Sequence, residues 1–499
     1  MTQSFLLGLS EMMTVQNVLF MFLGTIVGTV FGAIPGLTGS IAISILLPVT
    51  FYLDVMPSMA LLIGVYVGGS FGGSIPAILI GVPGAPESGI SVIDGMPMSK
   101  KGLSGKALLT ALYSSCVGNL LSGILSIVLV VSIAQLALKI GSTEFVGLLL
   151  FSLILIATIG SNGKWKRGLL AVFLGLLVSF IGLDPITGTA RFTFDNYKLF
   201  NGLQLIPVLI GLFVGAEMLG GVRSNAEEVQ KSKIDFKNEN RITRQDVKTS
   251  VPLILSGTVI GTIIGALPGL NAALSSTLNY GFAKKLSKHP EEFGNGSLEG
   301  VIAPEVAKNG TAAPTLVPLL TLGIPGSGTA AIFLGALLMQ GVICGPSIMT
   351  DSGDVVYGIF IAFLFCTITL LLVGRLFIQL AQYIIYIPMK VLIPIVVFTC
   401  CVGVYSNSSS LFDVGVLLVF MVIGYLMKLG GIPLLPLLIA YLLGDTLESQ
   451  FRRTLTISGG SFSIFAKSPI CMVFLLISLA LIIYTIAKPI IEKHRKKAQ

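Results

Sequence analysis

Four proline–glycine pairs interrupt the apolar sequence of this chain, at Pro35-Gly36, Pro83-Gly84, Pro268-Gly269 and Pro325-Gly326. Proline lacks an amide hydrogen and clashes with the preceding turn, so it ends or kinks a helix, and glycine permits backbone angles that other residues resist. Such a break exposes helix ends. N-terminal ends attract anions, whereas C-terminal ends and unwound carbonyls can coordinate sodium. The breaks therefore indicate a site for an anion, a cation or both.

Polar, uncharged side chains surround these breaks, and they can hold a cation or a carboxylate without placing a permanent charge in lipid. The predicted substrate-binding region comprises Pro35, Gly36, Thr38, Ser40, Pro83, Gly84, Pro268, Gly269, Asn271, Pro325, Gly326 and Ser327. The coupling-ion candidates are Ser74, Ser88, Asn309, Thr321 and Thr329. The alternative is that each hydroxyl satisfies its own helix backbone, and for any single Ser or Thr this alternative is the commoner case.

Charged side chains near the breaks are few. The acids are Glu87, Asp184, Glu217, Glu299, Glu305 and Asp445. An acid inside a membrane is a functional hypothesis because its burial costs several kcal/mol. Each of these acids could equally lie in a loop at the membrane interface. The bases Arg191 and Arg452-Arg453 stand where chain enters or leaves apolar sequence, a position suited to lipid headgroups or a partner subunit.

A catalytic centre has little to be built from. The two histidines lie in polar sequence, and the six cysteines include no CxxC pair. The chain contains no HExxH, no GxSxG with a partner histidine in an apolar segment and no paired aspartate motif. We therefore expect a protein that is not an enzyme, with no cofactor and no metal beyond a coupling ion, Na+ or H+.

The elements that carry the breaks must lie in a membrane. The 499 residues are 54% apolar and only 11% charged, with a mean hydropathy of +0.94. A soluble domain carries about 25% charged residues. This composition excludes a soluble enzyme, a disordered chain and a nucleic-acid module. It predicts an all-α polytopic membrane protein in contact with the lipid bilayer, with roughly 10–12 transmembrane helices.

The basic residues indicate an orientation. The net charge of +8 comes from cations in short loops between apolar runs, as at Lys100-Lys101 and Lys284-Lys285. Such cations are held on the cytoplasmic side. The first ten residues contain no Lys or Arg, so we expect no cleaved signal peptide. We predict an N-terminus outside and a C-terminus inside.

Three ordered matches predict an internal duplication. Gly32–Leu37 recurs as Gly265–Leu270, and Pro76 with Gly81–Gly84 recurs as Pro318 with Gly323–Gly326. The third match pairs Gly202, Pro207 and Gly215 with Gly431, Pro436 and Gly444. One match alone would indicate only close helix packing. Three in order predict a first transmembrane repeat at 1–221, a polar cytoplasmic linker at 222–250, a second repeat at 251–488, and a basic cytoplasmic tail at 489–499. Transporters are commonly built from two such halves, often inverted.

Four stretches resemble the large membrane subunit of the tripartite tricarboxylate transporters. They are Gly32–Pro48, Gly72–Lys101, Gly182–Phe194 and Gly294–Leu337. Arg452–Leu455 followed by Ser458-Gly459 resembles the closing motif of that family, and the likeness runs from about residue 16 to 485.

The resemblance implies import of small organic acids across the bacterial cytoplasmic membrane, driven by a sodium or proton gradient. It also implies two partners: an extracytoplasmic substrate-binding protein and a small four-helix membrane subunit. The large subunit would be the translocating part, and analogy at the level of the fold suggests an elevator motion of paired re-entrant hairpins.

This sequence departs from the family pattern at three places. Gly81 stands where an Asn is common, Pro86-Glu87-Ser88 replaces a small uncharged run, and Lys308 stands where a neutral residue is usual. An added acid and an added base near the presumed site argue against reading the substrate from the family name.

Two other functions compete with a carboxylate importer. A channel would conduct without a binding protein or a coupling ion. An intramembrane enzyme would need a nucleophile–base pair or a carboxylate dyad on facing helices.

Overall fold

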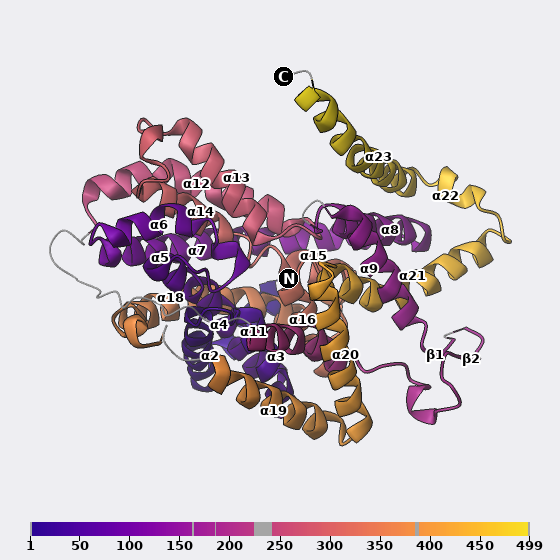
Figure 1. The fold of residues 1–499 in the computed structure, drawn as a ribbon. Helices are drawn as coiled ribbons and strands as arrows, with labels where there is room; N and C mark the ends of the chain where they lie inside the picture. Colours follow the sequence, from indigo (N-terminus) through magenta and orange to yellow (C-terminus); the bar gives the residue numbers. More distant parts are fainter. Residues whose placement is uncertain (1, 162–163, 185, 224–241, 385–388, 498–499) are drawn as a thin grey trace. The chain divides into compact units, whose positions relative to one another are not determined.

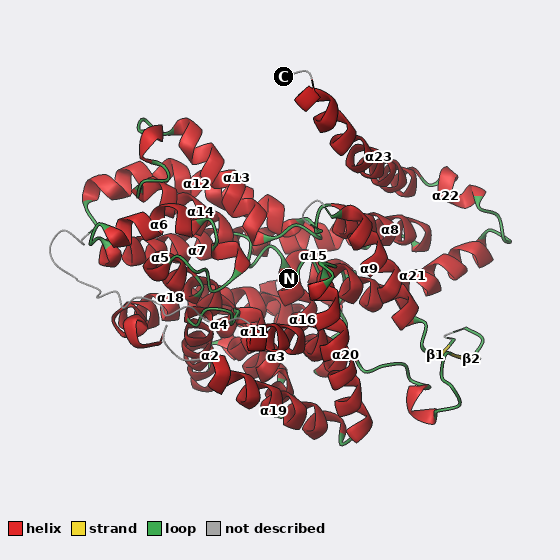
Figure 2. Ribbon diagram, in the orientation of Figure 1, coloured by secondary structure: helices red, strands yellow, loops and turns green. Residues whose placement is uncertain are grey.

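The computed structural model describes residues 2–161, 164–184, 186–223, 242–384 and 389–497. Within these ranges nearly all regular structure is helical, as Figure 2 shows, and one short antiparallel hairpin pairs β1 (Gly182–Leu183) with β2 (Ala190–Arg191). The expected all-α membrane class is confirmed. Most of the predicted linker, from 224 to 241, lies outside the described residues.

The chain divides into two compact units, and each takes segments from both halves of the sequence. The first unit holds residues 1–134, 217–267 and 271–407. Its helices are α1 (Thr2–Met12), α2 (Val15–Ala33), α3 (Gly39–Thr50), α4 (Val55–Gly72), α5 (Ser74–Ile80), η1 (Pro86–Ser88), α6 (Ser91–Lys100), most of α7 (Ser104–Ala137), most of α11 (Ala216–Arg223), α12 (Arg244–Ala266), α13 (Ala272–Leu286), η5 (Pro290–Glu292), α14 (Leu298–Asn309), α15 (Leu316–Leu322), α16 (Gly328–Met339), α17 (Ile348–Asp351), α18 (Gly353–Ile384) and nearly all of α19 (Met389–Ser408) (Figure 1).

The second unit holds residues 135–216, 268–270 and 408–499. Besides the hairpin it contains α8 (Ser142–Thr158), α9 (Trp165–Ser179), η2 (Tyr197–Leu199), α10 (Leu205–Ile210), the π-helical turn η3 (Gly211–Gly215), α20 (Leu411–Leu429), α21 (Leu434–Ile457), α22 (Ser463–Lys467) and α23 (Pro469–Lys497). The predicted repeats concern kinship along the sequence, and the boundaries of these units do not test that prediction.

Six helical segments among the described residues are long and apolar enough to cross a membrane. They are Val15–Ala33, Val55–Ile80, Ser104–Ala137, Gly353–Leu380, Leu411–Leu429 and Pro469–Ala487. The segment Val55–Ile80 contains both α4 and α5, and 89% of its most apolar window is buried inside the protein. A broken helix has unpaired backbone groups, so burial within protein is what a membrane environment requires of it.

Glycines at four-residue spacing bring α2 and α4 into contact. Gly24, Gly28 and Gly32 lie on α2. A β-carbon at Gly28 would lie only 2.2 Å from the carbonyl oxygen of Val65, on α4. A β-carbon at Gly68 of α4 would lie 2.3 Å from the carbonyl oxygen of Thr25. Small residues at this spacing allow backbones to approach closely in a membrane. The pair α2–α4 therefore forms the rigid support of the first break.

The second half repeats this arrangement on α12. Gly257, Gly261 and Gly265 stand at the same spacing, and a β-carbon at Gly261 would lie 2.7 Å from the carbonyl oxygen of Ala307 on α14. A β-carbon at Gly265 would lie 2.6 Å from the carbonyl oxygen of Thr311. The helix α12 thus supports α14 as α2 supports α4.

Candidate functional site

Two broken helices carry the candidate site. The short helix α5 follows Gly73, with φ −61° and ψ −21°, and the short helix α15 follows Thr315, with φ −62° and ψ −25°. The following short helices α5 and α15 end at Gly81 and Gly323, which have φ of 72° and 69°. This left-handed backbone favours glycine at both places. The two short helices therefore begin and end on matching backbone conformations.

The turns at the proline–glycine pairs also match. Gly36 has φ 86° and Gly269 has φ 84°. Thr38 then caps α3 by accepting the amide of Ile41, and Asn271 caps α13 by accepting the amide of Leu274. Each side chain satisfies one of the free N–H groups in the first turn of its helix.

Hydroxyl groups join the breaks of opposite halves. The Oγ of Ser40, in the first turn of α3, lies 2.6 Å from the Oγ1 of Thr329, in the first turn of α16. The Oγ of Ser276, on α13, donates to the carbonyl oxygen of Glu87, which lies in η1, at 3.4 Å. In each half, the helix that follows the first proline–glycine pair thus contacts the segment that follows the second pair of the other half. We call this arrangement the crossed pairing.

A buried ion pair lies on α14, in the first unit. Glu305 and Lys308 stand one turn apart on α14, and Glu305 Oε2 lies 2.9 Å from Lys308 Nζ. Their side chains are 0% and 1% exposed. Burying two charges costs several kcal/mol per ion unless other polar groups surround them. The pair therefore needs the polar groups that neighbouring elements supply.

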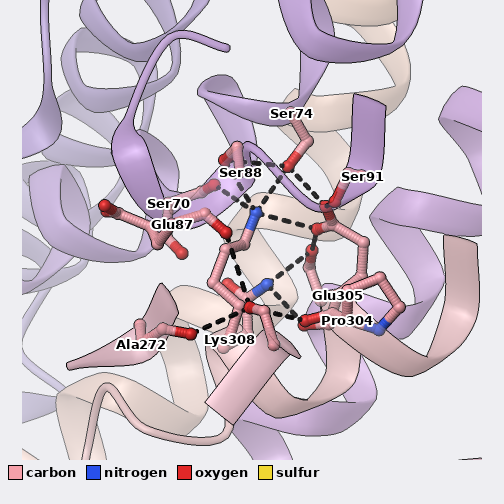
Figure 3. Close-up of polar contacts among 12 residues, drawn as sticks. Ser70, Ser74, Glu87, Ser88, Ser91, Ala272, Pro304, Glu305 and Lys308 are labelled. Atoms are coloured by element: carbon pink, nitrogen blue, oxygen red, sulfur yellow. Dashed lines mark hydrogen bonds and ion pairs between the residues drawn. The ribbon is translucent and has the colours of Figure 1, made fainter. Parts of the chain in front are cut away.

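The ammonium of Lys308 is enclosed by oxygen atoms, as Figure 3 shows. Besides Glu305, Nζ donates to the carbonyl oxygen of Ser70 at 3.0 Å, to the Oγ of Ser74 at 2.5 Å and to the Oγ of Ser88 at 3.2 Å. These three serines come from α4, α5 and η1, on either side of the first break. The lysine of the second half is thus held by the broken helix of the first half.

The carboxylate of Glu305 has its own set of donors. Oε1 accepts from the Oγ of Ser74 at 2.7 Å and from the Oγ of Ser91 at 2.5 Å. Oε2 accepts from the Oγ of Ser115 at 3.1 Å. Asn309 extends the network, because its Nδ2 donates to Ser115 at 2.8 Å. The Oδ1 of Asn309 is buried and has no hydrogen-bond partner, so one acceptor in this cluster remains unused.

Asp94 fixes the segment that enters α14. Its Oδ1 accepts the backbone amides of Gly294, Gly296 and Ser297 at 2.8–2.9 Å, and its Oδ2 accepts the hydroxyl of Tyr280 at 2.8 Å. A fully buried carboxylate that receives four hydrogen bonds holds its loop in one conformation. Asp94 is therefore a structural support one element away from the ion pair.

A second charged cluster lies in the second unit and is more accessible. Arg191 contacts Glu448 at 2.9 Å and Asp184 at 3.5 Å, and Arg452 contacts the same two acids at 2.6 and 3.0 Å. The amides of Thr187 and Ile186 together with Arg452 lower the pKa of Asp184 to about 2. Arg191 and Arg452 thus pair within the chain, where the sequence suggested headgroups or a partner subunit. The cluster joins the β1–β2 hairpin to α21.

The structure separates the predicted site residues into groups. Pro35, Gly36, Thr38 and Ser40 lie in the turn and first residues of α3, and Ser327 caps the facing α16, directly after Pro325 and Gly326. Pro83 and Gly84 lie in the loop before η1, where the amide of Gly84 donates to the carbonyl oxygen of Gly73. Pro268 and Gly269 group with the second unit, and a β-carbon at Gly269 would lie 2.5 Å from a side-chain carbon of Ile156.

The coupling-ion candidates divide in the same way. Ser74, Ser88 and Asn309 belong to the cluster around Lys308 and Glu305. Thr329 lies instead at the crossed pairing, against Ser40. Thr321 donates to the carbonyl oxygen of Val317 on its own helix, which was the alternative for any single hydroxyl. Ser91, Ser115 and Asp94 were not predicted from the sequence.

The chain is similar to known proteins along nearly its whole length. Residues 18–439 match the family described as the tripartite tricarboxylate transporter TctA family. An uncharacterized 52.8 kDa protein of Agrobacterium vitis, from the TAR-I ttuC' 3' region, is 33% identical over 98% of this chain and 97% of its own length. A second uncharacterized protein of that organism, from the TAR-II ttuC' 3' region, is 35% identical over 46% of this chain and 94% of its own length.

A more distant relative is an uncharacterized protein of Methanocaldococcus jannaschii, 28% identical over 39% of this chain and 48% of its own length. No solved structure matches the chain.

Proposed function

The chain belongs to the tripartite tricarboxylate transporter TctA family, and from this premise we propose that it is the translocating subunit of a binding-protein-dependent importer of small di- or tricarboxylates. It works in the bacterial cytoplasmic membrane as a multi-pass protein. A sodium or proton gradient drives uptake. Its partners are a small four-helix membrane subunit and an extracytoplasmic protein that delivers the substrate.

The observation that carries this proposal is the meeting of two helix N-termini, those of α3 and α16. Thr38 and Ser327 cap them, and Ser40 and Thr329 join their first turns at 2.6 Å. Free N–H groups and the positive end of the helix dipole favour a carboxylate at such a place. Broken helices that face one another from two halves are the usual setting of a transporter site.

The proposal is tested by uptake into proteoliposomes that contain this chain and its small partner subunit. The binding protein, loaded with a labelled di- or tricarboxylate, is added with and without inward sodium or proton gradients. Accumulation that requires both the binding protein and a gradient supports the proposal. Flux that needs neither indicates a channel and contradicts it.

Substitutions at the breaks sharpen this test. Gly84→Leu and Gly326→Leu are each expected to abolish uptake while protein remains in the membrane. At Gly84 the reason is geometric, because even a β-carbon would lie 2.1 Å from the carbonyl oxygen of Gly32. Gly281→Ala on α13 is the control, since a β-carbon there meets no atom within 4 Å. Normal uptake by both leucine variants would remove the proposed role of the breaks.

A further inference from the structure

The group around Lys308 has the composition of a monovalent-cation site. Four oxygen atoms surround Nζ within 3.2 Å: one carboxylate, two hydroxyls and one main-chain carbonyl. Hard metal cations prefer oxygen ligands of these kinds, and in transporters unwound carbonyls and helix C-terminal ends coordinate sodium. The four oxygen atoms come from four elements, α4, α5, η1 and α14, so the tertiary structure has assembled them around one point.

The position of the carbonyl ligand supports this interpretation. Ser70 lies in the last turn of α4, which ends at Gly72, and carbonyls in the last turn of a helix lack partners within it. The negative end of the helix dipole also favours a cation there. A positive charge at this point therefore satisfies both the end of α4 and the carboxylate of Glu305.

The lysine is not placed to bind substrate. The side chain of Lys308 is 1% exposed, and its ammonium has four oxygen neighbours for three N–H donors. No donor is left over for a carboxylate from solution. The ammonium serves the interior of the protein.

We propose that the Lys308 ammonium is a tethered cation that fills a monovalent-cation site, so that this chain binds no sodium there and removal of the ammonium opens a sodium site. Sodium and the ammonium cannot share the shell, because two positive charges would lie about 3 Å apart in a buried place. If the proposed transport function holds, the consequence is that sodium does not drive uptake through this shell.

The test compares purified wild-type protein with Lys308→Met and Lys308→Gln. Radioactive ²²Na+ binding and thermal unfolding are measured in NaCl and in choline chloride at equal ionic strength. Both variants should bind sodium about 10-fold more than wild type and unfold at a higher temperature in NaCl, because a ligand that binds only the folded state stabilises it. The wild type should show neither effect. Lithium and potassium serve as probes of size selectivity.

The double variant Lys308→Met/Glu305→Gln is the matched control. It keeps the emptied shell and removes the negative charge, so the sodium binding gained by Lys308→Met should be lost. Sodium binding by the wild type that Ser74→Ala weakens would overturn the proposal, and so would single variants that fold but bind no more sodium than wild type. Variants that fail to fold even when prepared in NaCl also contradict it, because sodium should replace the missing charge.

The outcome is separable from that of the proposed function. Sodium binding is measured on purified protein and does not depend on transport. Failure of uptake with sodium binding as expected would contradict only the proposed function. Uptake as expected with no sodium gained by either variant would contradict only the tethered cation.

Discussion

The two broken helices of the first unit, α4–α5 and α14–α15, share a backbone and differ in side chains. With Pro76 matched to Pro318, Ile63 corresponds to Glu305 and Tyr66 to Lys308. Only the second copy therefore carries charges. The first copy supplies a carbonyl and hydroxyls, and these surround the charges of the second. Both halves therefore contain a broken helix, but the charged groups lie on one copy and the polar groups that surround them lie on the other.

The different packing of the two copies explains why the charges stand where they do. The face of α4 toward α2 is lined by glycines, and β-carbons at Gly64, Gly68 and Gly72 would each lie within 2.6 Å of a backbone oxygen of α2. On α4 the residue at the position of Lys308 is Tyr66, and its ring lies 5.9 Å from the rings of Phe333 and Phe363. On α14 Glu305 instead accepts hydrogen bonds from serines of α5, α6 and α7. The charges therefore stand in the copy whose neighbours are hydroxyl groups.

The largest expected effect comes from breaking the ion pair in the charged copy. Glu305→Gln leaves the Lys308 ammonium buried without a counter-ion, and removing one partner of a buried pair costs about 3–5 kcal/mol. Thermal unfolding of the purified protein, in choline chloride so that sodium cannot take part, measures the loss of stability.

Replacing both charges tests whether the loss comes from the unpaired charge. Glu305→Gln/Lys308→Met should recover most of the stability, because neutral replacement of a buried pair is often tolerated. If the double variant loses the sum of the two single losses, the charges do not act as a pair.

The next effect comes from overfilling the glycine-lined copy. Gly84→Ala places a methyl group 2.9 Å from the Cα of Gly73 as well as against the backbone of α2, and overpacking costs about 1–3 kcal/mol. Uptake should fall with the melting temperature. Gly281→Ala, on a helix with free space around it, should keep uptake and gain up to about 1 kcal/mol from helix propensity.

A smaller effect is expected where the two copies share a backbone, and it should be somewhat larger at Gly81, where a β-carbon would lie 2.7 Å from the Sδ of Met96. Gly81→Ala and Gly323→Ala each put a β-carbon on left-handed backbone, at a cost of about 1–2 kcal/mol. Gly81→Asn should cost less than Gly81→Ala, because asparagine tolerates this conformation better. Melting temperatures check both statements. A large loss at one glycine with none at the other would contradict the shared backbone.

The smallest effect is expected in the charged cluster of the second unit, in comparison with the buried pair of the first unit. The pKa of Asp184 is lowered from 3.8 to about 2, so its ionised form stabilises the fold above about pH 4, and this contribution is lost as the pH falls towards 2. Asp184→Asn should remove that part of the pH dependence. It should cost less stability at pH 7 than Glu305→Gln, because Arg191 and Arg452 are 23% and 38% exposed and keep Glu448 as a partner. Thermal unfolding between pH 7 and pH 2.5 provides the measurement.

Much of the architecture could be predicted from the sequence because its signals are local. Low charge and long apolar runs predicted the all-α membrane class, and the family likeness is confirmed by the match over 18–439. The glycine triplets of α2 and α12 are also visible in the sequence, because Gly257, Gly261 and Gly265 repeat the spacing of Gly24, Gly28 and Gly32. Their shared spacing supports the predicted duplication, which stays a prediction.

The candidate site was harder to predict because its contacts are tertiary. Ser74, Ser88 and Asn309 were identified from their closeness to the breaks. Ser91 and Ser115 contact Glu305 only because α6 and α7 pack against α14, and no local sequence pattern predicts that packing. The spacing of Glu305 and Lys308 was the missed signal, because an acid and a base three residues apart on a helix face one another.

The oxygen shell of Lys308 also has a consequence for the time course of synthesis. Ser70 emerges from the ribosome 238 residues before the lysine that it binds. At about 5–20 residues per second, the serines of the first half wait on the order of 10–50 s for their charged partner. During that interval the first half holds polar groups without their native contacts. Membrane insertion of the first half and formation of its contacts with Lys308 are therefore separate events during synthesis.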